Sequence, residues 1–121
     1  KAKVFMQLAD LQVEYQNYPE ALAAVESAIQ ADVRSRGSSK LLLVKAQAEY
    51  ETGRYAEAVE SYEKLLKTPR LDAKTKARIS FRLGMAAKQA GDSEKAFQAF
   101  KNASFGPYQP AAEAEMTALK R

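Results

Sequence analysis

A short pattern recurs three times in the sequence at almost constant spacing. Each copy has turn-forming residues, then a Glu or Lys, an alanine and a large apolar residue, and the copies begin at Asn17, Gly53 and Gly91. The alanines recur with a period of 37 to 38 residues: Ala21, Ala58 and Ala96. A period of this length indicates stacked copies of one supersecondary unit, so the chain is restricted to a repeat architecture.

The punctuation around each copy predicts a helical hairpin. Helix-compatible stretches of about 14 residues precede and follow each copy. Gly53 and Gly91 stand where a first helix would end, because glycine enters the left-handed cap conformation without steric cost. The predicted unit is therefore helix, turn, helix.

Polar residues at the expected helix starts indicate N-caps. Asn17 is followed three residues later by Glu20, as in a capping box, and Pro19 falls in the first turn, where its missing N–H costs nothing. The helices further along the chain have N-cap candidates of their own: Ser38 or Ser39, Asp72 and Asp92.

Small residues in the first helices predict close contact with the second helices. We expect these small residues to face the periodic alanines, so that two backbones approach closely: Ala9, Ala46 and Gly84. One turn beyond each periodic alanine a larger residue continues the buried face: Val25, Tyr62 and Phe100. The opposite face of the second helices carries Glu57, Glu60 and Glu63, which we expect to face water.

The pattern resembles the tetratricopeptide repeat (TPR) family, most specifically in the Gly-Arg-Tyr-x-Glu-Ala-Val-x-x-Tyr-x-Lys-Leu run at 53–65. The resemblance implies an all-α, right-handed α-solenoid of three helix-turn-helix hairpins at about 2–36, 39–71 and 73–106. A C-terminal helix at about 110–121 follows two prolines. We expect one domain over 1–121, as a segment of a longer protein. Lys45, Ser80 and Ser93 depart from the family pattern, since the first two stand at usually apolar positions and the third replaces an aromatic residue.

The same resemblance implies a binding surface on the first helices. In that family the inner faces of the first helices hold an extended peptide or a partner helix. Carried over by position, the surface comprises Lys3, Met6, Gln7, Asp10 and Val13, then Lys40, Leu43, Val44, Gln47 and Tyr50, then Arg78, Phe81, Arg82, Met85 and Lys88. Its mixture of apolar and basic residues favours a partner that carries acidic groups.

One TPR subclass grips the C-terminal carboxylate of its partner with basic and amide side chains from three repeats. Arg78 and Arg82 match its third-repeat positions. The earlier positions hold Met6, Asp10 and Val44, which do not match, and Asp10 would repel a carboxylate. A clamp of this kind is therefore disfavoured, although two arginines one helical turn apart still suit a carboxylate or phosphate.

The chain contains no histidine and no cysteine. Histidine is the commonest general base near neutral pH and the commonest transition-metal ligand, and cysteine supplies thiolate nucleophiles and zinc ligands. The paired glutamates of the second helices lie on a polar face, where nothing separates their pKa values. We therefore expect a protein that is not an enzyme and has no cofactor or metal.

Charge and hydropathy complete the expectations. The net charge of +4 comes from interspersed basic and acidic residues, which is typical of a solvated surface. The longest apolar runs, such as Leu41–Val44, are far below the ~18 residues that cross a bilayer, so we expect a soluble segment, cytoplasmic or periplasmic, without membrane insertion.

The function that these features favour is a protein-interaction scaffold or adaptor that holds a peptide or helix. A structural spacer or self-association segment of a longer solenoid is the alternative. RNA binding is disfavoured and we expect no nucleic acid, because successive repeats show no matched polar readers. The turns look like those of bacterial repeat proteins, many of which assemble envelope or secretion machinery; this is an analogy.

Overall fold

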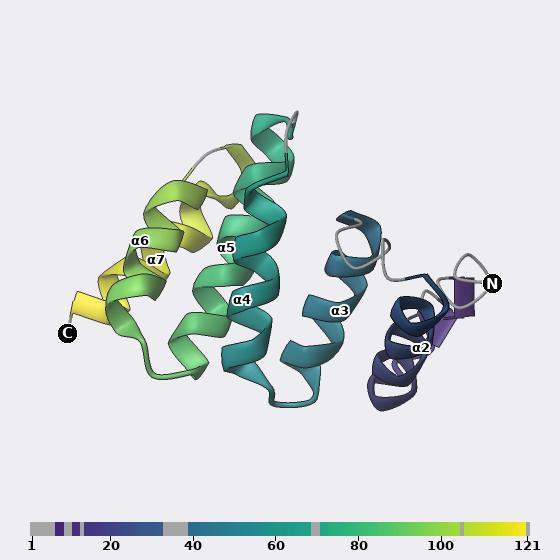
Figure 1. Ribbon diagram of the computed structural model, residues 1–121. Helices are drawn as coiled ribbons and strands as arrows, with labels where there is room; N and C mark the ends of the chain where they lie inside the picture. Colours follow the sequence, from purple (N-terminus) through teal and green to yellow (C-terminus); the bar gives the residue numbers. More distant parts are fainter. Residues whose placement is uncertain are drawn as a thin grey trace. The chain divides into compact units, whose positions relative to one another are not determined.

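The computed structural model describes residues 7–8, 11–12, 14–32, 39–68, 71–104 and 106–120, and most of these residues are helical (Figure 1). The helices are α2 Tyr18–Ala31, α3 Ser39–Glu51, α4 Tyr55–Leu66, α5 Ala73–Gln89, α6 Ser93–Ala103, the short 3-10 helix η2 Gly106–Tyr108, and α7 Gln109–Lys120. No strand occurs among the described residues, so the all-α prediction is confirmed. None of these helices is long and apolar enough to span a membrane.

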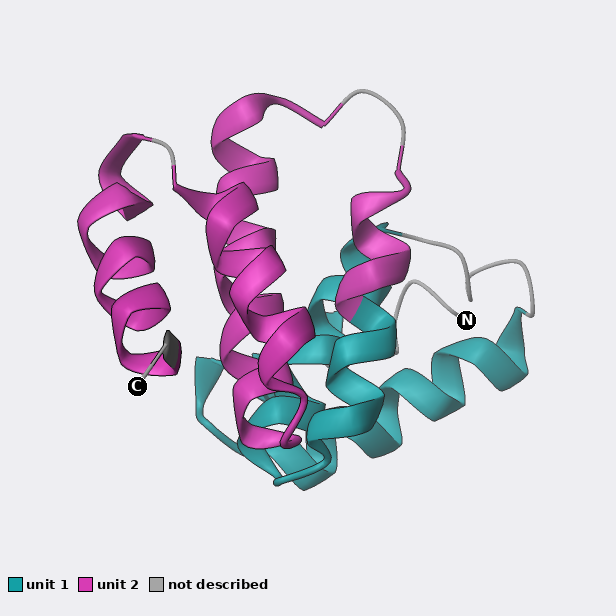
Figure 2. Cartoon of the chain, turned by 90° about the vertical axis from the view of Figure 1, so that its left-hand side faces the viewer, with its two compact units in different colours: residues 1–61 teal, residues 62–121 magenta. Residues whose placement is uncertain are grey.

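The chain forms two compact units, residues 1–61 and 62–121, and their boundary falls within α4 (Figure 2). The core of the first unit lies between α2 and α3, which contribute Ala24, Val25, Ala28, Leu41 and Val44, with Ile29 packed against them. Val44 therefore belongs to this core and not to the exposed face on which the sequence analysis placed it.

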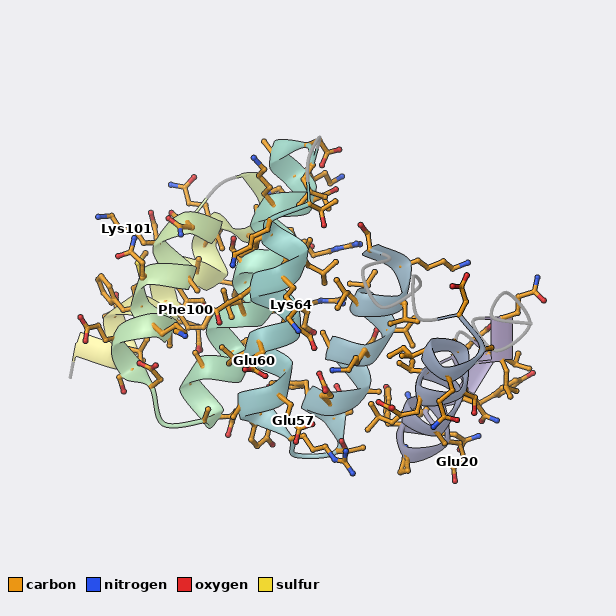
Figure 3. All side chains as sticks on the ribbon, in the orientation of Figure 1. Glu20, Glu57, Glu60, Lys64, Phe100 and Lys101 are labelled. Atoms are coloured by element: carbon orange, nitrogen blue, oxygen red, sulfur yellow. The ribbon has the colours of Figure 1, made fainter. Side chains whose placement is uncertain are left out.

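The second unit is built on the α5–α6 hairpin, against which α7 packs through α6. Gly84 of α5 lies directly against the ring of Phe100, which projects from α6 and is fully buried (Figure 3). A Cβ atom at position 84 would stand 2.7 Å from two atoms of that ring. The small residue predicted for close helix packing thus accommodates Phe100, one turn beyond the periodic alanine.

The periodic alanines have the burial that the repeat predicts. Ala21, Ala58 and Ala96 are all fully buried, and so is Ala46 of the first-helix set. Ala9 lies outside the described residues. Glu57 and Glu60 follow one another along α4 and are exposed (Figure 3), whereas Glu63 is half-buried and its carboxylate lies 3.2 Å from Nζ of Lys95.

The hairpin turns confirm the predicted glycine geometry. Gly53 has φ +83° and Gly91 has φ +87°, in the left-handed region that favours glycine. The first copy has no glycine at the equivalent place, and there Gln16 adopts φ +62°. The first turn therefore has the same left-handed backbone conformation as the other two, but this conformation costs more free energy for Gln16 because it has a side chain.

The helix starts agree with the predicted caps at two of three tested places. The Asp72 carboxylate accepts a hydrogen bond from the Thr75 backbone N–H at 2.7 Å, and the Asp92 carboxylate accepts one from the Lys95 N–H at 3.0 Å. The capping box at Asn17 was a wrong prediction, since its side chain makes no cap bond and its amide donates to the Gln12 side chain. Ser39 is the first residue of α3, and Ser38 lies outside the described residues.

Candidate functional site

The predicted third-repeat residues lie on one face of α5. Arg78, Phe81, Arg82, Met85 and Lys88 follow the three- and four-residue spacing that keeps side chains on one side of a helix, and we call them the α5 surface. The opposite side of α5 is the buried one, with Ala77, Ile79, Ser80, Leu83, Gly84, Ala86 and Ala87. The first four members of the α5 surface are half-buried, and Lys88 is exposed.

The two arginines of the α5 surface form no direct ion pair within the part of the chain that the structure describes. Neither Arg78 nor Arg82 forms an ion pair with a carboxylate of the described residues, whereas other cations of the same unit, such as Lys95, do. Nε of Arg78 is sealed from solvent and has no hydrogen-bond acceptor. A buried N–H without an acceptor is costly. The other N–H groups of the two half-buried guanidiniums suit a carboxylate.

One carboxylate stands near the start of α5 and is already engaged. The Thr75 side chain and backbone N–H hold the pKa of Asp72 below its usual range, and the positive charges of Lys74 and Arg78 lower this pKa further. Because the Asp72 carboxylate caps α5, it does not occupy the place where a partner's carboxylate would bind both arginines.

The C-terminal segment contacts two members of the α5 surface. The ring of Phe81 lies 5.8 Å from the ring of Tyr108, centroid to centroid, and Nζ of Lys88 lies 2.9 Å from a carboxylate oxygen of Glu115. The sequence does not predict these contacts. The only available signal was the apolar Tyr108 before an alanine-rich helix, and it did not indicate which face of α5 that helix would meet.

The predicted second-repeat residues lie along α3. Lys40 is exposed, while Leu43, Gln47 and Tyr50 are half-buried, and Tyr50 meets the Tyr55 ring edge-on with centroids 5.3 Å apart. In the first repeat Gln7 is exposed. The remaining predicted members lie outside the described residues: Lys3, Met6, Asp10 and Val13.

A buried polar network in the first unit was also missed. Glu49 of α3 is only 1% exposed, and it binds both Lys45 and Ser61. Lys45 departs from the family pattern as a polar residue at a usually apolar position, but that pattern predicts no partner for it. The signal was available in the sequence, because Glu49 stands one helical turn after Lys45.

Open hollows occur on the described surface, and two of them are lined by described residues. The larger, about 520 Å³, is lined mainly by polar side chains including Glu63, Asp92 and Lys95, and the smaller, about 390 Å³, lies between Pro19 and Arg54. The described residues hold no group of three or more metal-ligating side chains placed for a metal ion.

The hairpin geometry, glycine turns and buried alanines define a TPR-class helical repeat. The family model for the SusR N-terminal TPR domain matches residues 1–109, and the chain belongs to this family. A search of curated protein sequences gives no match.

Solved structures show the same fold. The type III secretion chaperone SycD of Yersinia enterocolitica, in complex with a peptide of the translocator YopD, is 17% identical, with TM-score 0.77, over 98% of this chain and 91% of that one. PcrH, in complex with the chaperone-binding region of PopD, is 17% identical, with TM-score 0.76, over 98% and 90%. The N-terminal domain of stress-induced protein-1 from C. elegans is 22% identical, with TM-score 0.77, over 99% and 94%.

Proposed function

We propose that the chain is a non-catalytic protein-interaction module that holds a partner peptide or helix on its first-helix faces, and that the α5 surface receives an acidic group of that partner. The observation that carries the proposal is the pair of half-buried arginines, Arg78 and Arg82, which form no ion pair with a carboxylate of the described residues. They stand one helical turn apart, so one carboxylate or two neighbouring ones can reach both.

The fold supports a peptide as the partner. Two structures of the same fold hold segments of other proteins: SycD binds a peptide of the translocator YopD, and PcrH binds the chaperone-binding region of PopD. Arginine and half-buried aromatic side chains are the residue types that dominate binding energy at protein interfaces. The process we propose, by analogy, is bacterial envelope assembly or secretion.

Peptide display on the immobilised chain tests this proposal. Selected peptides should be enriched in Asp and Glu, and the double variant Arg78→Gln/Arg82→Gln should bind them at least tenfold more weakly, because a hydrogen bond to a charged group contributes about 1.5–3 kcal/mol. The control Arg54→Gln/Lys101→Gln removes two exposed cations outside the α5 surface and should bind normally. Equal affinity of both double variants would contradict the proposal, as would strongly salt-dependent binding of oligonucleotides alone.

Self-association is a second candidate, favoured by a separate observation. Leu8, Leu11 and Tyr15 are large apolar side chains at least 41% exposed; Leu8 and Leu11 are helical and three residues apart, and Tyr15 lies in the turn before α2. Sedimentation at rising protein concentration should then show a dimer that Leu11→Glu abolishes. A monomer at every concentration would contradict self-association, and peptide binding would then be the remaining candidate.

A further inference from the structure

Phe81 lies between two aromatic rings that differ in burial. Its centroid is 5.5 Å from Phe100, which is fully buried, and 5.8 Å from Tyr108, which is half-buried. Phe100 fixes Phe81 from the core side, while Tyr108 borders it on the accessible side. The aromatic pair that a partner can reach is therefore Phe81 of α5 with Tyr108 of η2.

The segment that carries Tyr108 is anchored at several points. Ala112 of α7 is fully buried, α7 packs along α6, and Glu115 forms its ion pair with Lys88. These contacts hold Tyr108 in place beside α5. A ring held in advance loses little conformational freedom when a partner binds, which favours its use as a contact residue.

We propose that Tyr108 is a binding residue of the α5 surface and that it selects partner segments in which an aromatic side chain adjoins a carboxylate; this rests on the proposed function. Arg78 stands three residues before Phe81 and four before Arg82, and this spacing places Phe81 and Arg82 beside Arg78 on one side of α5. Rings pair favourably edge-to-face or offset, and guanidinium groups bind carboxylates.

The charges of the patch limit where the carboxylate binds. Lys88 is already paired with Glu115 at 2.9 Å, so its positive charge is largely satisfied within the chain. Among the described residues no carboxylate forms an ion pair with Arg78 or Arg82, and Nε of Arg78 lacks an acceptor. The acidic group is therefore directed to the arginines, and the partner's ring to Phe81 and Tyr108.

Small probes test this assignment by NMR on the full chain. We use 3-phenylpropionate, which joins a ring to a carboxylate, together with acetate and 2-phenylethanol as single-group probes. A ligand of this size should bind with a dissociation constant on the order of millimolar. The signals of Arg78 Nε–H, Arg82 and Tyr108 should shift with 3-phenylpropionate at concentrations where neither single-group probe shifts them.

Matched tyrosine variants complete the test. Tyr108→Leu keeps an apolar contact with Phe81 but removes the ring. The affinity for 3-phenylpropionate should fall about fivefold, while the response to concentrated acetate should stay unchanged. The control Tyr55→Leu breaks the Tyr50–Tyr55 ring pair of the first unit and should have no effect. Tyr108→Ala, with helicity checked by circular dichroism, should weaken binding at least as much as Tyr108→Leu.

The outcomes separate the two proposals. If 3-phenylpropionate shifts the arginine signals but binds both Tyr108 variants normally, the role of Tyr108 is wrong and the acidic-partner proposal stands. Tighter binding to Tyr108→Ala would also overturn it, since the C-terminal segment would then cover the site. If no carboxylate probe perturbs the arginines in any variant, both proposals fall.

Discussion

The carboxylate of Glu49 accepts a hydrogen bond from the hydroxyl of Ser61 at 2.7 Å, and this bond joins α3 to α4 within the first unit. The other carboxylate oxygen lies 2.8 Å from Nζ of Lys45. Glu49 and Ser61 are 1% and 2% exposed. A buried carboxylate is tolerated only when it is paired and hydrogen-bonded, so the network restricts which side of α3 can face α4.

Lys45→Met should therefore destabilise the protein although methionine suits a buried position. The substitution leaves Glu49 buried with only the Ser61 hydroxyl as a partner, and removal of one member of a buried pair costs several kcal/mol. Because Lys45 is itself partly exposed, we expect a loss of about 2–3 kcal/mol in urea unfolding monitored by circular dichroism.

The triple variant Lys45→Met/Glu49→Leu/Ser61→Ala is the matched control. It removes every polar member of the network, so no unpaired group remains, and it should recover most of the stability lost in Lys45→Met. A triple variant less stable than the single variant would show that the network itself contributes the stability.

Gly84→Ala should destabilise the second unit, against the usual helix propensity. Alanine is favoured over glycine in a helix by about 1 kcal/mol, but the new Cβ would stand 2.7 Å from the buried Phe100 ring. Overpacking outweighs propensity here, and we expect a net loss of about 1–3 kcal/mol in thermal or urea unfolding. Phe100→Leu in the same chain should cost less than the sum of the single changes, and a stabilising Gly84→Ala would refute the close contact.

Gln16→Gly should stabilise the first unit. Gln16 adopts φ +62° at the place where the other two turns have Gly53 and Gly91, and a side chain in this conformation costs about 1–2 kcal/mol. Part of that gain is offset by the greater freedom of glycine in the unfolded chain, so we expect about 1 kcal/mol. Gly53→Ala, where a Cβ meets no atom within 4 Å, should lose a comparable amount through backbone strain alone.

The ionisation of Asp72 should make the folding stability depend on pH in the acidic range. Since its folded-state pKa is lowered, chiefly by Thr75, the ionised carboxylate stabilises the folded chain above the unfolded pKa of about 4. This contribution is lost as the pH falls through the folded-state pKa. The stability advantage of the wild type over Asp72→Asn should thus shrink below about pH 4 in urea unfolding, and Thr75→Val should reduce the pH dependence. A constant difference from pH 7 to pH 2 would contradict this role.

The sequence by itself determined the helices, their punctuation and the repeat. Glycine at the left-handed turn positions and aspartate before α5 and α6 act through atoms within a few residues, so Gly53, Gly91, Asp72 and Asp92 could be interpreted without a fold. The face of α5 with Arg78 and Arg82 likewise follows from helical spacing. The assignment of that face to a partner stays a prediction.

Only the tertiary structure decided which side chains meet across helices. Gln16 takes a glycine conformation because the hairpin requires the turn, and Asn17 bonds to Gln12 instead of capping α2. The contact of Tyr108 with Phe81 joins residues far apart in the chain, and the Glu49–Ser61 bond does the same between α3 and α4. Such pairings depend on how two helices are rotated about their axes, which packing sets for the whole unit and local sequence does not encode.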